Sequence, residues 1–261
     1  MGDIVTERSE GILRVALNRP AKKNAMTSSM YLDLAGIFNE AAKDESVRVV
    51  LWHGAGDAFT AGNDIGDFLG NPPEAGGSPQ SKLMHMLLEF DKPLIAAVRG
   101  IAVGGGTTML LHCDFVYASE NTRFQLPFIN LALLPEFGSS YLLPLTVGHA
   151  RAAELILLGL PFDAGRAQEM GLVTKIVPDP DVLQVAMETA HKLATKPSDA
   201  LRAAKRLLKR PFRDQVRGAM DAENGAFSLQ TRSEEAKEAF AAFLEKRPPD
   251  FSRAMKSMTA R

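Results

Sequence analysis

Residues 102–119 read AVGGGTTMLLHCDFVYAS, in which three consecutive glycines follow a β-rich run and open a helical stretch. Glycine leaves its backbone amide accessible, and the N-terminus of a helix attracts anions. The run does not match the G-x-G-x-x-G dinucleotide fingerprint, and no Gly-Lys-Ser/Thr follows it as in a P-loop. It therefore indicates either a turn that binds an oxygen or a close approach of strand and helix.

Further β-rich runs lie on both sides of this turn and alternate with helical stretches. A helix is predicted over residues 26–44, because apolar residues recur there at helical spacing, with Thr27 or Ser28 as the N-cap. Strands that alternate with helices are typical of an α/β fold with largely parallel pairing. The strands are predicted at residues 12–17, 48–54, 92–100, 114–120 and 172–177.

The organisation changes at about Pro197, after which the periodic stretches are helical. The earlier segment GNPPEAGGSPQ, residues 70–80, is rich in Gly, Pro and Ser, but strands and helices resume after it, so a loop rather than a domain linker is predicted. We expect a core over residues 1–196 and a helical region over residues 197–261.

The composition is that of an ordinary globular protein, with 46% hydrophobic and 23% charged residues. The formal net charge of −1 gives no whole-chain attraction to nucleic acid or an acidic membrane. No run approaches the roughly 18 apolar residues of a membrane span, and the first residues lack the apolar centre of a signal peptide. The single cysteine excludes an internal disulfide, which fits a cytoplasmic location. The five histidines show no metal-ligand spacing, and nothing indicates a metal or a redox cofactor.

One segment, RAAKRLLKRPFRDQVR at residues 202–217, carries seven Arg or Lys residues. A basic helix can bind RNA, but the segment lacks the interleaved aromatic residues of a base-stacking surface. The pattern favours a solvated basic face with apolar residues, including Leu207 and Leu208, packed beneath it.

A second glycine-rich turn, GDAFTAGNDIGDF, occupies residues 56–68 after the strand predicted at 48–54. Such turns often serve only to reverse the chain. Two exposed amides from two separate turns can, however, form an oxyanion hole, which stabilises a carbonyl oxygen that gains negative charge.

Glu136 lies in the segment LPEFGSSYLLP, where a helix is predicted to begin near Gly138 with Ser139 or Ser140 as its cap. An exposed acid near a helix N-terminus is favourable to the helix dipole. Among apolar neighbours the same carboxyl would have a raised pKa and could act as a general base. The local sequence leaves both interpretations open.

Four segments together resemble the crotonase (enoyl-CoA hydratase/isomerase) superfamily, from about Gly11 to Phe251. They are NRPAKKNAM (18–26), AFTAGNDIGDF (58–68), AVGGGTTMLLHCDFVYAS (102–119) and FDAGRAQEMGLVTKIVP (162–178). The resemblance implies a spiral of ββα units that binds an acyl-CoA thioester, and a C-terminal helical region that builds homotrimers, which commonly pair into hexamers. It places the protein in fatty acid and lipid metabolism, with coenzyme A as part of the substrate rather than a cofactor.

The resemblance also implies site residues. The thioester oxygen would lie between the backbone amides of Asn63 and Gly105. Further positions match segments that hold the CoA, the last two of them from a neighbouring subunit: Lys22, Lys23, Ala25, Ala61, Gly62, Asp64, Ile65, Phe227 and Lys246.

The departures from the hydratase pattern concern the catalytic acids. Hydratases of this family carry glutamates where this chain has Thr108 and Phe128. Addition of water needs such a carboxylate pair, whereas Phe128 transfers no proton and would help to exclude water from the substrate. Glu136 instead matches the catalytic acid of the Δ3,Δ2-enoyl-CoA isomerase branch, where one carboxylate moves a proton from C2 to C4.

The sequence therefore predicts an isomerase that converts 3-enoyl-CoA to trans-2-enoyl-CoA. Three alternatives stay open. They are an isomerase for an aromatic-derived acyl-CoA, a hydratase that uses Glu136 with another group, and a non-catalytic relative that binds acyl-CoA or RNA.

Overall fold

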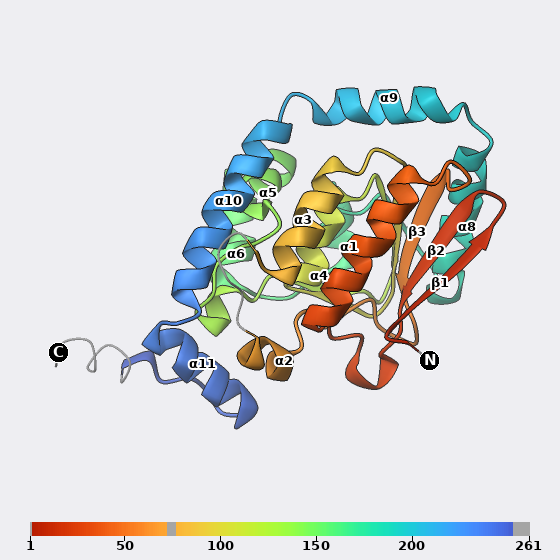
Figure 1. Ribbon diagram of the computed structural model, residues 1–261. Coiled ribbons are helices and arrows are strands. Elements are labelled where there is room, and N and C mark those ends of the chain that lie inside the picture. The colour runs from red at the N-terminus through yellow and green to blue at the C-terminus, as the bar shows by residue number, and fades with distance from the viewer. Residues whose placement is uncertain (1, 72–76, 253–261) are drawn as a thin grey trace.

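The computed structural model describes residues 2–71 and 77–252. Its centre is a six-stranded sheet with the strand order β1-β2-β3-β4-β6-β9, in which only the β1–β2 pair is antiparallel (Figure 1). The strands are β1 (Ile4–Ser9), β2 (Ile12–Leu17), β3 (Val49–Gly54), β4 (Leu94–Val98), β6 (Phe115–Ser119) and β9 (Lys175–Val177). All five predicted strands are thus confirmed in position, although β9 is shorter than the predicted run at 172–177.

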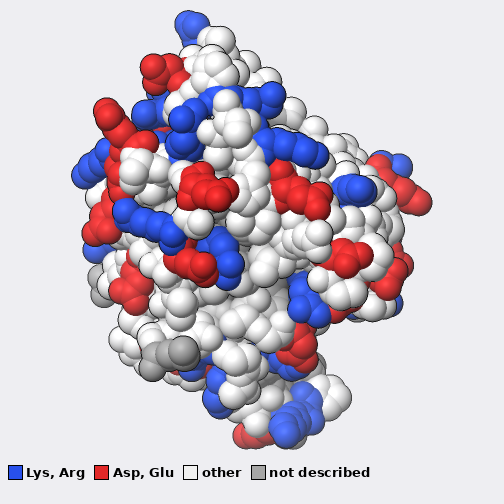
Figure 2. Space-filling model, turned by 90° about the vertical axis from the view of Figure 1, so that its right-hand side faces the viewer, with Lys and Arg blue, Asp and Glu red and all other residues white. Residues whose placement is uncertain are grey.

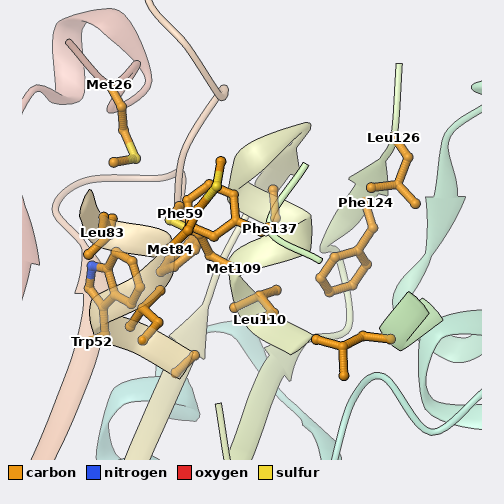
Figure 3. Close-up of a cluster of buried hydrophobic side chains, with 14 of the residues drawn as sticks. Met26, Trp52, Phe59, Leu83, Met84, Met109, Leu110, Phe124, Leu126 and Phe137 are labelled. Carbon is orange, nitrogen blue, oxygen red and sulfur yellow. The ribbon is translucent and has the colours of Figure 1, made fainter. Parts of the chain in front are cut away.

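The central strands are apolar throughout because both faces of the sheet are covered. In β3, Val50 and Trp52 belong to the larger core, while Val49 and Leu51 belong to a second cluster on the opposite face. Buried parallel strands read as continuous hydrophobic runs for this reason. Figure 3 shows Trp52 beside Phe59 and Met84 within the larger core.

Two helices pack on the side of the larger core, and one covers the other face (Figure 1). The first two are α1 (Ser28–Lys43), capped by Thr27 as predicted, and α3 (Pro79–Glu89). The opposite face is covered by α8 (Val182–Ala194), which buries Val182, Ala186 and Ala190 at four-residue spacing.

A second, three-stranded sheet carries the glycine triplet at the end of one strand. It consists of β5 (Ile101–Val103), β7 (Arg123–Gln125) and β8 (Phe162–Asp163). These three strands are too short for a readable period and were not predicted from the sequence. β1, whose residues are mostly exposed, was not predicted either.

Short helices connect these strands, and three longer ones end the described chain. The connecting helices are η1 (Pro20–Lys22), α2 (Ile65–Gly70), α4 (Gly105–Thr108), η2 (Met109–His112), η3 (Ile129–Leu131), α5 (Ser139–Val147), α6 (His149–Leu158), α7 (Ala164–Glu169) and η4 (Asp179–Asp181). The final helices are α9 (Ser198–Lys209), α10 (Arg213–Gln230) and α11 (Glu234–Leu244), which confirms the helical region predicted after Pro197. The predicted loop at 70–80 is shorter at its ends, because α2 includes Gly70 and α3 begins at Pro79; residues 72–76 lie outside the described residues.

The orientation predicted for α9 is wrong. Leu207 and Leu208 are 63% and 74% exposed, whereas Lys205 is only 5% exposed. Lys205 Nζ lies 2.6 Å from the Asp114 carboxylate and donates to the carbonyl of Lys92. Lys209 Nζ donates to the carbonyls of Leu87, Leu88 and Phe90 at the C-terminal end of α3. The inward face of α9 is therefore its basic face, because these lysines find acceptors beneath the helix.

Most charges of the basic segment have partners within the chain. Arg202 and Arg206 pair with Asp91, while Arg213 and Arg217 pair with Glu89. Figure 2 shows basic and acidic side chains interspersed over one face of the molecule. The segment thus offers less positive charge to a nucleic acid than its composition suggests. Among the helices of the described ranges, none is both long enough and apolar enough to cross a membrane.

Candidate active site

A pocket of about 600 Å³ opens where the two glycine-rich turns face α11 and the start of α2. Of the residues singled out in the sequence, the following line it: Lys22, Ala25, Ala61, Gly62, Asn63, Asp64, Ile65, Gly105, Phe128, Glu136 and Phe227. Lys23 and Lys246 are not among the lining residues, and Lys23 Nζ lies 2.5 Å from the Asp57 carboxylate. Arg247, which the sequence analysis did not select, is a lining residue next to Lys246.

A backbone bridge aligns the two turns. Thr60 and Ala102 form an isolated parallel bridge, with the Thr60 amide donating to Ile101 and the Val103 amide donating to Thr60. Asn63 and Gly105 each follow their bridge residue by three positions. Equal offsets from a parallel bridge bring these two residues to the same end of the pair, where both line the pocket.

Glycine is required at this junction because the two turns are in contact. A Cβ added to Gly106 would lie 2.3 Å from Thr60 Cγ2, and one added to Gly62 would lie 2.8 Å from the carbonyl oxygen of Val103. The triplet therefore does serve close packing. Its middle member, Gly105, is also the first residue of α4, where a backbone amide has no acceptor within the helix.

The backbone of Asn63 is oriented by a second bridge. The Met26 amide donates to the carbonyl of Gly62, and the Asp64 amide donates to the carbonyl of Met26. Met26 is therefore hydrogen-bonded to the residues on both sides of Asn63. In such a parallel bridge the Asn63 amide points away from Met26. The Asn63 side chain is fixed as well, since the Tyr31 hydroxyl lies 2.6 Å from its Oδ1.

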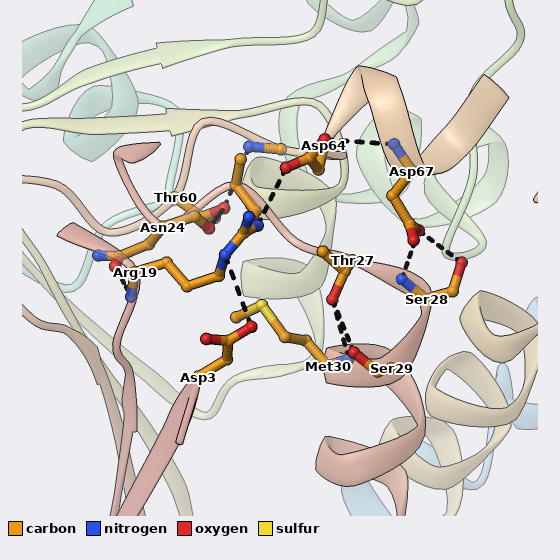
Figure 4. Close-up of polar contacts among 12 residues, drawn as sticks. Asp3, Arg19, Asn24, Thr27, Ser28, Ser29, Met30, Thr60, Asp64 and Asp67 are labelled. Atoms are coloured by element: carbon orange, nitrogen blue, oxygen red, sulfur yellow. Dashed lines mark hydrogen bonds and ion pairs between the residues drawn. The ribbon is translucent and has the colours of Figure 1, made fainter. Parts of the chain in front are cut away.

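Arg19 and Asn24 hold the turn at residues 19–25 against this frame (Figure 4). The buried Asn24 side chain donates to the carbonyls of Ala55 and Ala58 and accepts the Arg19 amide. The Arg19 guanidinium donates to the Ala25 carbonyl at 2.5 Å and to Asp64 at 3.1 Å. The segment that carries Lys22 and Ala25 is thereby fixed at one side of the pocket.

Glu136 is buried beside Gly105. Its residue is 3% exposed, and its Oε1 has no hydrogen-bond partner among the described residues. A Cβ added to Gly105 would lie 2.7 Å from this oxygen. Burial, and secondly the negative charge of Glu223, raises the pKa of Glu136 to about 8. Of the two interpretations left open, the buried carboxyl is the one that the structure has.

Two residues outside the predicted site, His112 and Glu223, hold the backbone around Glu136. Phe137 and Gly138 have positive φ angles of 61° and 68°, and the His112 ring nitrogen Nε2 lies 2.8 Å from the Phe137 carbonyl. Burial lowers the pKa of His112 to about 4, so the neutral ring donates this hydrogen bond through Nε2–H. A backbone in this left-handed region is strained for Phe137 and persists because its surroundings fix it.

The other residue is Glu223 of α10, which caps α5 from a distance. Its two carboxylate oxygens accept the amides of Gly138 and Ser140, each at 2.7 Å. The predicted capping by Ser139 or Ser140 is wrong, because neither hydroxyl accepts from an amide of this first turn and Gly138 is the N-cap. The local sequence around Gly138 cannot indicate this cap, because Glu223 lies 85 positions further along the chain.

Comparison with known proteins identifies the family of the chain. A family model described as "Enoyl-CoA hydratase/isomerase" matches residues 7–254. The chain belongs to this family. A crystal structure of an enoyl-CoA hydratase/isomerase from Pseudoalteromonas atlantica T6c is 38% identical, covers 95% of this chain and 99% of that one, and has a TM-score of 0.90. The fold is therefore the expected crotonase fold with a C-terminal helical region.

Curated relatives in the family have different reactions at similar identity. The 2,3-dehydroadipyl-CoA hydratase of Escherichia coli (strain K12) is 35% identical over 252 residues, which are 96% of this chain and 99% of that protein. Enoyl-CoA delta isomerase 2 of Rattus norvegicus is 33% identical over 253 residues, which are 95% of this chain and 64% of that protein. The chain is thus an enzyme of the enoyl-CoA hydratase/isomerase family, and its reaction must be argued from the site.

The two positions at which the sequence departs from the hydratase pattern, Thr108 and Phe128, have different surroundings in the structure. Thr108 is fully buried and does not line the pocket; its hydroxyl lies 3.3 Å from the carbonyl of Gly105. Phe128 lines the pocket. The lining contains one other acid, Asp64, which pairs with Arg19 and caps α2. Glu136 is therefore the acidic lining residue that has an oxygen without a hydrogen-bond partner.

Proposed function

We propose that this protein is an acyl-CoA double-bond isomerase that converts 3-enoyl-CoA to trans-2-enoyl-CoA. Glu136 moves the proton, and the amides of Asn63 and Gly105 donate to the thioester oxygen. The observation that supports this proposal is the buried Glu136 carboxyl beside Gly105, with Oε1 unpaired and its pKa raised to about 8.

The chemistry needs one carboxylate. Ionised Glu136 takes a proton from C2, the C2–H electrons form a C1–C2 double bond, and negative charge collects on the thioester oxygen. Two backbone amides stabilise this dienolate, which is the kind of electrostatic term that contributes most to many enzymes. The protonated acid then gives the proton to C4, where the C3–C4 double-bond electrons form the new C–H bond, while the C1–C2 pair moves to form the C2–C3 double bond and the thioester carbonyl is restored. No net oxidation occurs and coenzyme A leaves with the product, so we propose no separate cofactor or metal.

The raised pKa suits this double role. A carboxyl with a pKa of about 8 is a stronger base than an ordinary glutamate, and near neutral pH it exchanges its proton in both directions. Because Glu136 is buried, water competes poorly for the proton while the carboxyl carries it from C2 to C4.

Hydration has less support at this site. It needs one group to activate water and another to move the proton at the neighbouring carbon. Among the described lining residues, Asp64 is engaged by Arg19, and Phe128 offers no proton. The same base would serve an isomerase for an aromatic-derived acyl-CoA, which differs only in the acyl group.

The remaining predicted residues enter the proposal as contacts to coenzyme A. Lys22, Ala25, Ala61, Gly62 and Ile65 line the side of the pocket formed by the two turns. We propose that they hold the adenine and pantetheine parts, with Asp64 positioning the segment through Arg19. Phe227 lines the pocket of its own chain, whereas the sequence placed it at a contact from a neighbouring subunit, so we propose that it contacts the acyl-CoA bound by its own chain. Lys246 is proposed to reach the CoA of a neighbouring subunit in a homotrimer, and Lys23 to meet CoA phosphates from the rim.

The deciding experiment compares two substrates. Purified protein is incubated with trans-3-hexenoyl-CoA and with crotonyl-CoA, and absorbance of the conjugated thioester is followed. We expect conjugation to appear from the first and crotonyl-CoA to stay unchanged. Glu136→Gln should abolish the first signal, whereas Glu169→Gln, at an exposed glutamate of α7, should leave it intact. Loss of the crotonyl-CoA absorbance would identify a hydratase instead, and no change with either substrate would contradict the proposal.

A further inference from the structure

A second, small cavity adjoins the main pocket. It shares Phe68, Phe227 and Glu136 with that pocket, and its volume of about 10 Å³ has room for about one water molecule. Because Glu136 borders both spaces, an acyl chain whose reacting carbons meet Glu136 can extend its next atoms into the small cavity. The size of the cavity restricts this extension to one small group.

The cavity is unusually polar for a site that would hold the end of a fatty acyl chain. Besides Phe68, Met84 and Phe227, it is lined by Ser78, Gln80 and Asn224. The Ser78 hydroxyl accepts the Ser81 amide as the cap of α3, and Asn224 Nδ2 lies 3.4 Å from the Ser81 hydroxyl. These two side chains already have partners.

Gln80 differs from both. It is 5% exposed, and its Oε1 has no hydrogen-bond partner among the described residues. A buried polar atom that stays unpaired costs free energy, and a ligand that pairs with it regains that cost. A primary amide offers an acceptor on one atom and donors on the other, so a hydroxyl, which both donates and accepts, suits either orientation of the amide.

The charge around the cavity excludes an anionic group. Its described lining residues include the carboxyl of Glu136 but no lysine or arginine, and Glu223 lies close enough to raise the pKa of Glu136. A terminal carboxylate on the acyl chain would meet like charge without a counter-ion.

We infer that the acyl group of the substrate is short and carries an uncharged hydroxyl at its distal end, and that Gln80 selects it. This inference rests on the proposed function, since it takes Glu136 as the group that meets the reacting carbons. Gln80 acts as a specificity-determining residue and has no part in proton transfer.

Saturated thioesters have no double bond to shift, so freshly prepared samples test the inference without isomerisation. Three pairs differ only in a terminal methyl or hydroxyl: pentanoyl-CoA and 4-hydroxybutanoyl-CoA, hexanoyl-CoA and 5-hydroxypentanoyl-CoA, heptanoyl-CoA and 6-hydroxyhexanoyl-CoA. Binding is measured by titration calorimetry, with glutaryl-CoA as the anionic probe. In at least one pair the hydroxyl member should bind about tenfold more tightly, as expected when a buried unpaired group gains a hydrogen bond. Glutaryl-CoA should bind more weakly than either member of that pair.

Two variants assign the preference to Gln80. Gln80→Leu and Gln80→Met should lose the preference for the hydroxyl, while Gln184→Leu, at an exposed glutamine of α8, should keep it. Because each Gln80 variant removes an unpaired buried atom, its Tm should rise by about 2 °C or more. A fall in Tm for both variants would show that the amide is already satisfied in the folded chain and would overturn the inference.

The failures of the two proposals are distinguishable. Equal binding within every pair, together with active isomerisation of trans-3-hexenoyl-CoA, would overturn only the hydroxyl preference. A clear hydroxyl preference in a protein that isomerises no 3-enoyl-CoA would overturn the proposed function and retain Gln80 as a selector of acyl groups.

Discussion

Two regions of this molecule bury an ionisable side chain, and the two side chains differ in their hydrogen-bond partners. Under α9, Lys205 is 5% exposed and its ammonium reaches both the Asp114 carboxylate and a backbone carbonyl. Beside the glycine triplet, Glu136 is 3% exposed and one of its oxygens has no partner among the described residues. A buried charge with partners fastens one element to another. A buried carboxyl with an unpaired oxygen is left available for a substrate.

The largest expected effect comes from removing the proposed proton carrier, Glu136. Glu136→Gln keeps the shape of the side chain but cannot exchange a proton, so kcat for trans-3-hexenoyl-CoA should fall at least about 100-fold. Steady-state kinetics of both proteins measure this. A variant that retains more than a tenth of the activity would show that Glu136 is not the proton carrier. The unpaired oxygen of Glu136 would then have no catalytic role to contrast with the structural role of Lys205.

The next effect tests the fastening role of Lys205. Lys205→Met retains most of the aliphatic stem but leaves Asp114 and the carbonyl of Lys92 without the ammonium, so the free energy of unfolding should fall by about 2 kcal/mol or more. Lys237→Met is the matched control, because Lys237 pairs with Glu234 while its side chain is 63% exposed. Exposed pairs contribute about 0–1 kcal/mol. Equal losses in urea denaturation would contradict the distinction between the two lysines.

A smaller effect concerns the pH dependence of the rate. In the proposed mechanism only ionised Glu136 removes the C2 proton, so kcat/KM should rise with pH and level off above the pKa of about 8. The charge of Glu223 contributes to that raised value, so Glu223→Gln should move the inflection to lower pH while it also weakens the cap of α5. An unmoved inflection would indicate that Glu223 acts only as a cap.

The last expected effect is a change of stability with pH. The pKa of Glu136 is raised from 4.5 to about 8 on folding, so between these values the folded chain binds more of this proton than the unfolded chain. The contribution of Glu136 to the free energy of unfolding is therefore retained at low pH and lost as pH rises through this window. Glu136→Gln lacks the contribution, so its Tm relative to that of the original protein should increase from pH 5 to pH 8. A difference that stays constant over this range would refute the raised pKa.

The sequence predicted the parts of this molecule that are encoded locally. The run at 48–54 is apolar on both faces, and Thr27 stands in front of a periodic helix, so β3 and α1 could be placed within a few residues. The positions of Asn63 and Gly105 at one pocket followed from the family motifs, and the Thr60–Ala102 bridge gives them a physical basis.

The parts that escaped prediction depend on contacts between distant segments. The cap on α5 is supplied by Glu223 of α10, and the inward face of α9 is decided by Asp114 and by the carbonyls at the end of α3. Hydrophobic periodicity predicts that leucines face inward and lysines face outward. It contains no information about the hydrogen-bond acceptors that lie beneath α9. His112 escaped for the same reason, since its partner is a carbonyl of a strained loop 25 positions away.

The bridge between Thr60 and Ala102 bears on how such a site can change over evolutionary time. The spacing of the Asn63 and Gly105 amides is set by main-chain hydrogen bonds, which every residue other than proline can make. Substitutions at the pocket-lining positions 128 and 136 therefore leave the bridge between the two turns intact. Under the proposed function, the acid of such a site can change, or be redesigned, while the main-chain frame that binds the thioester oxygen is kept.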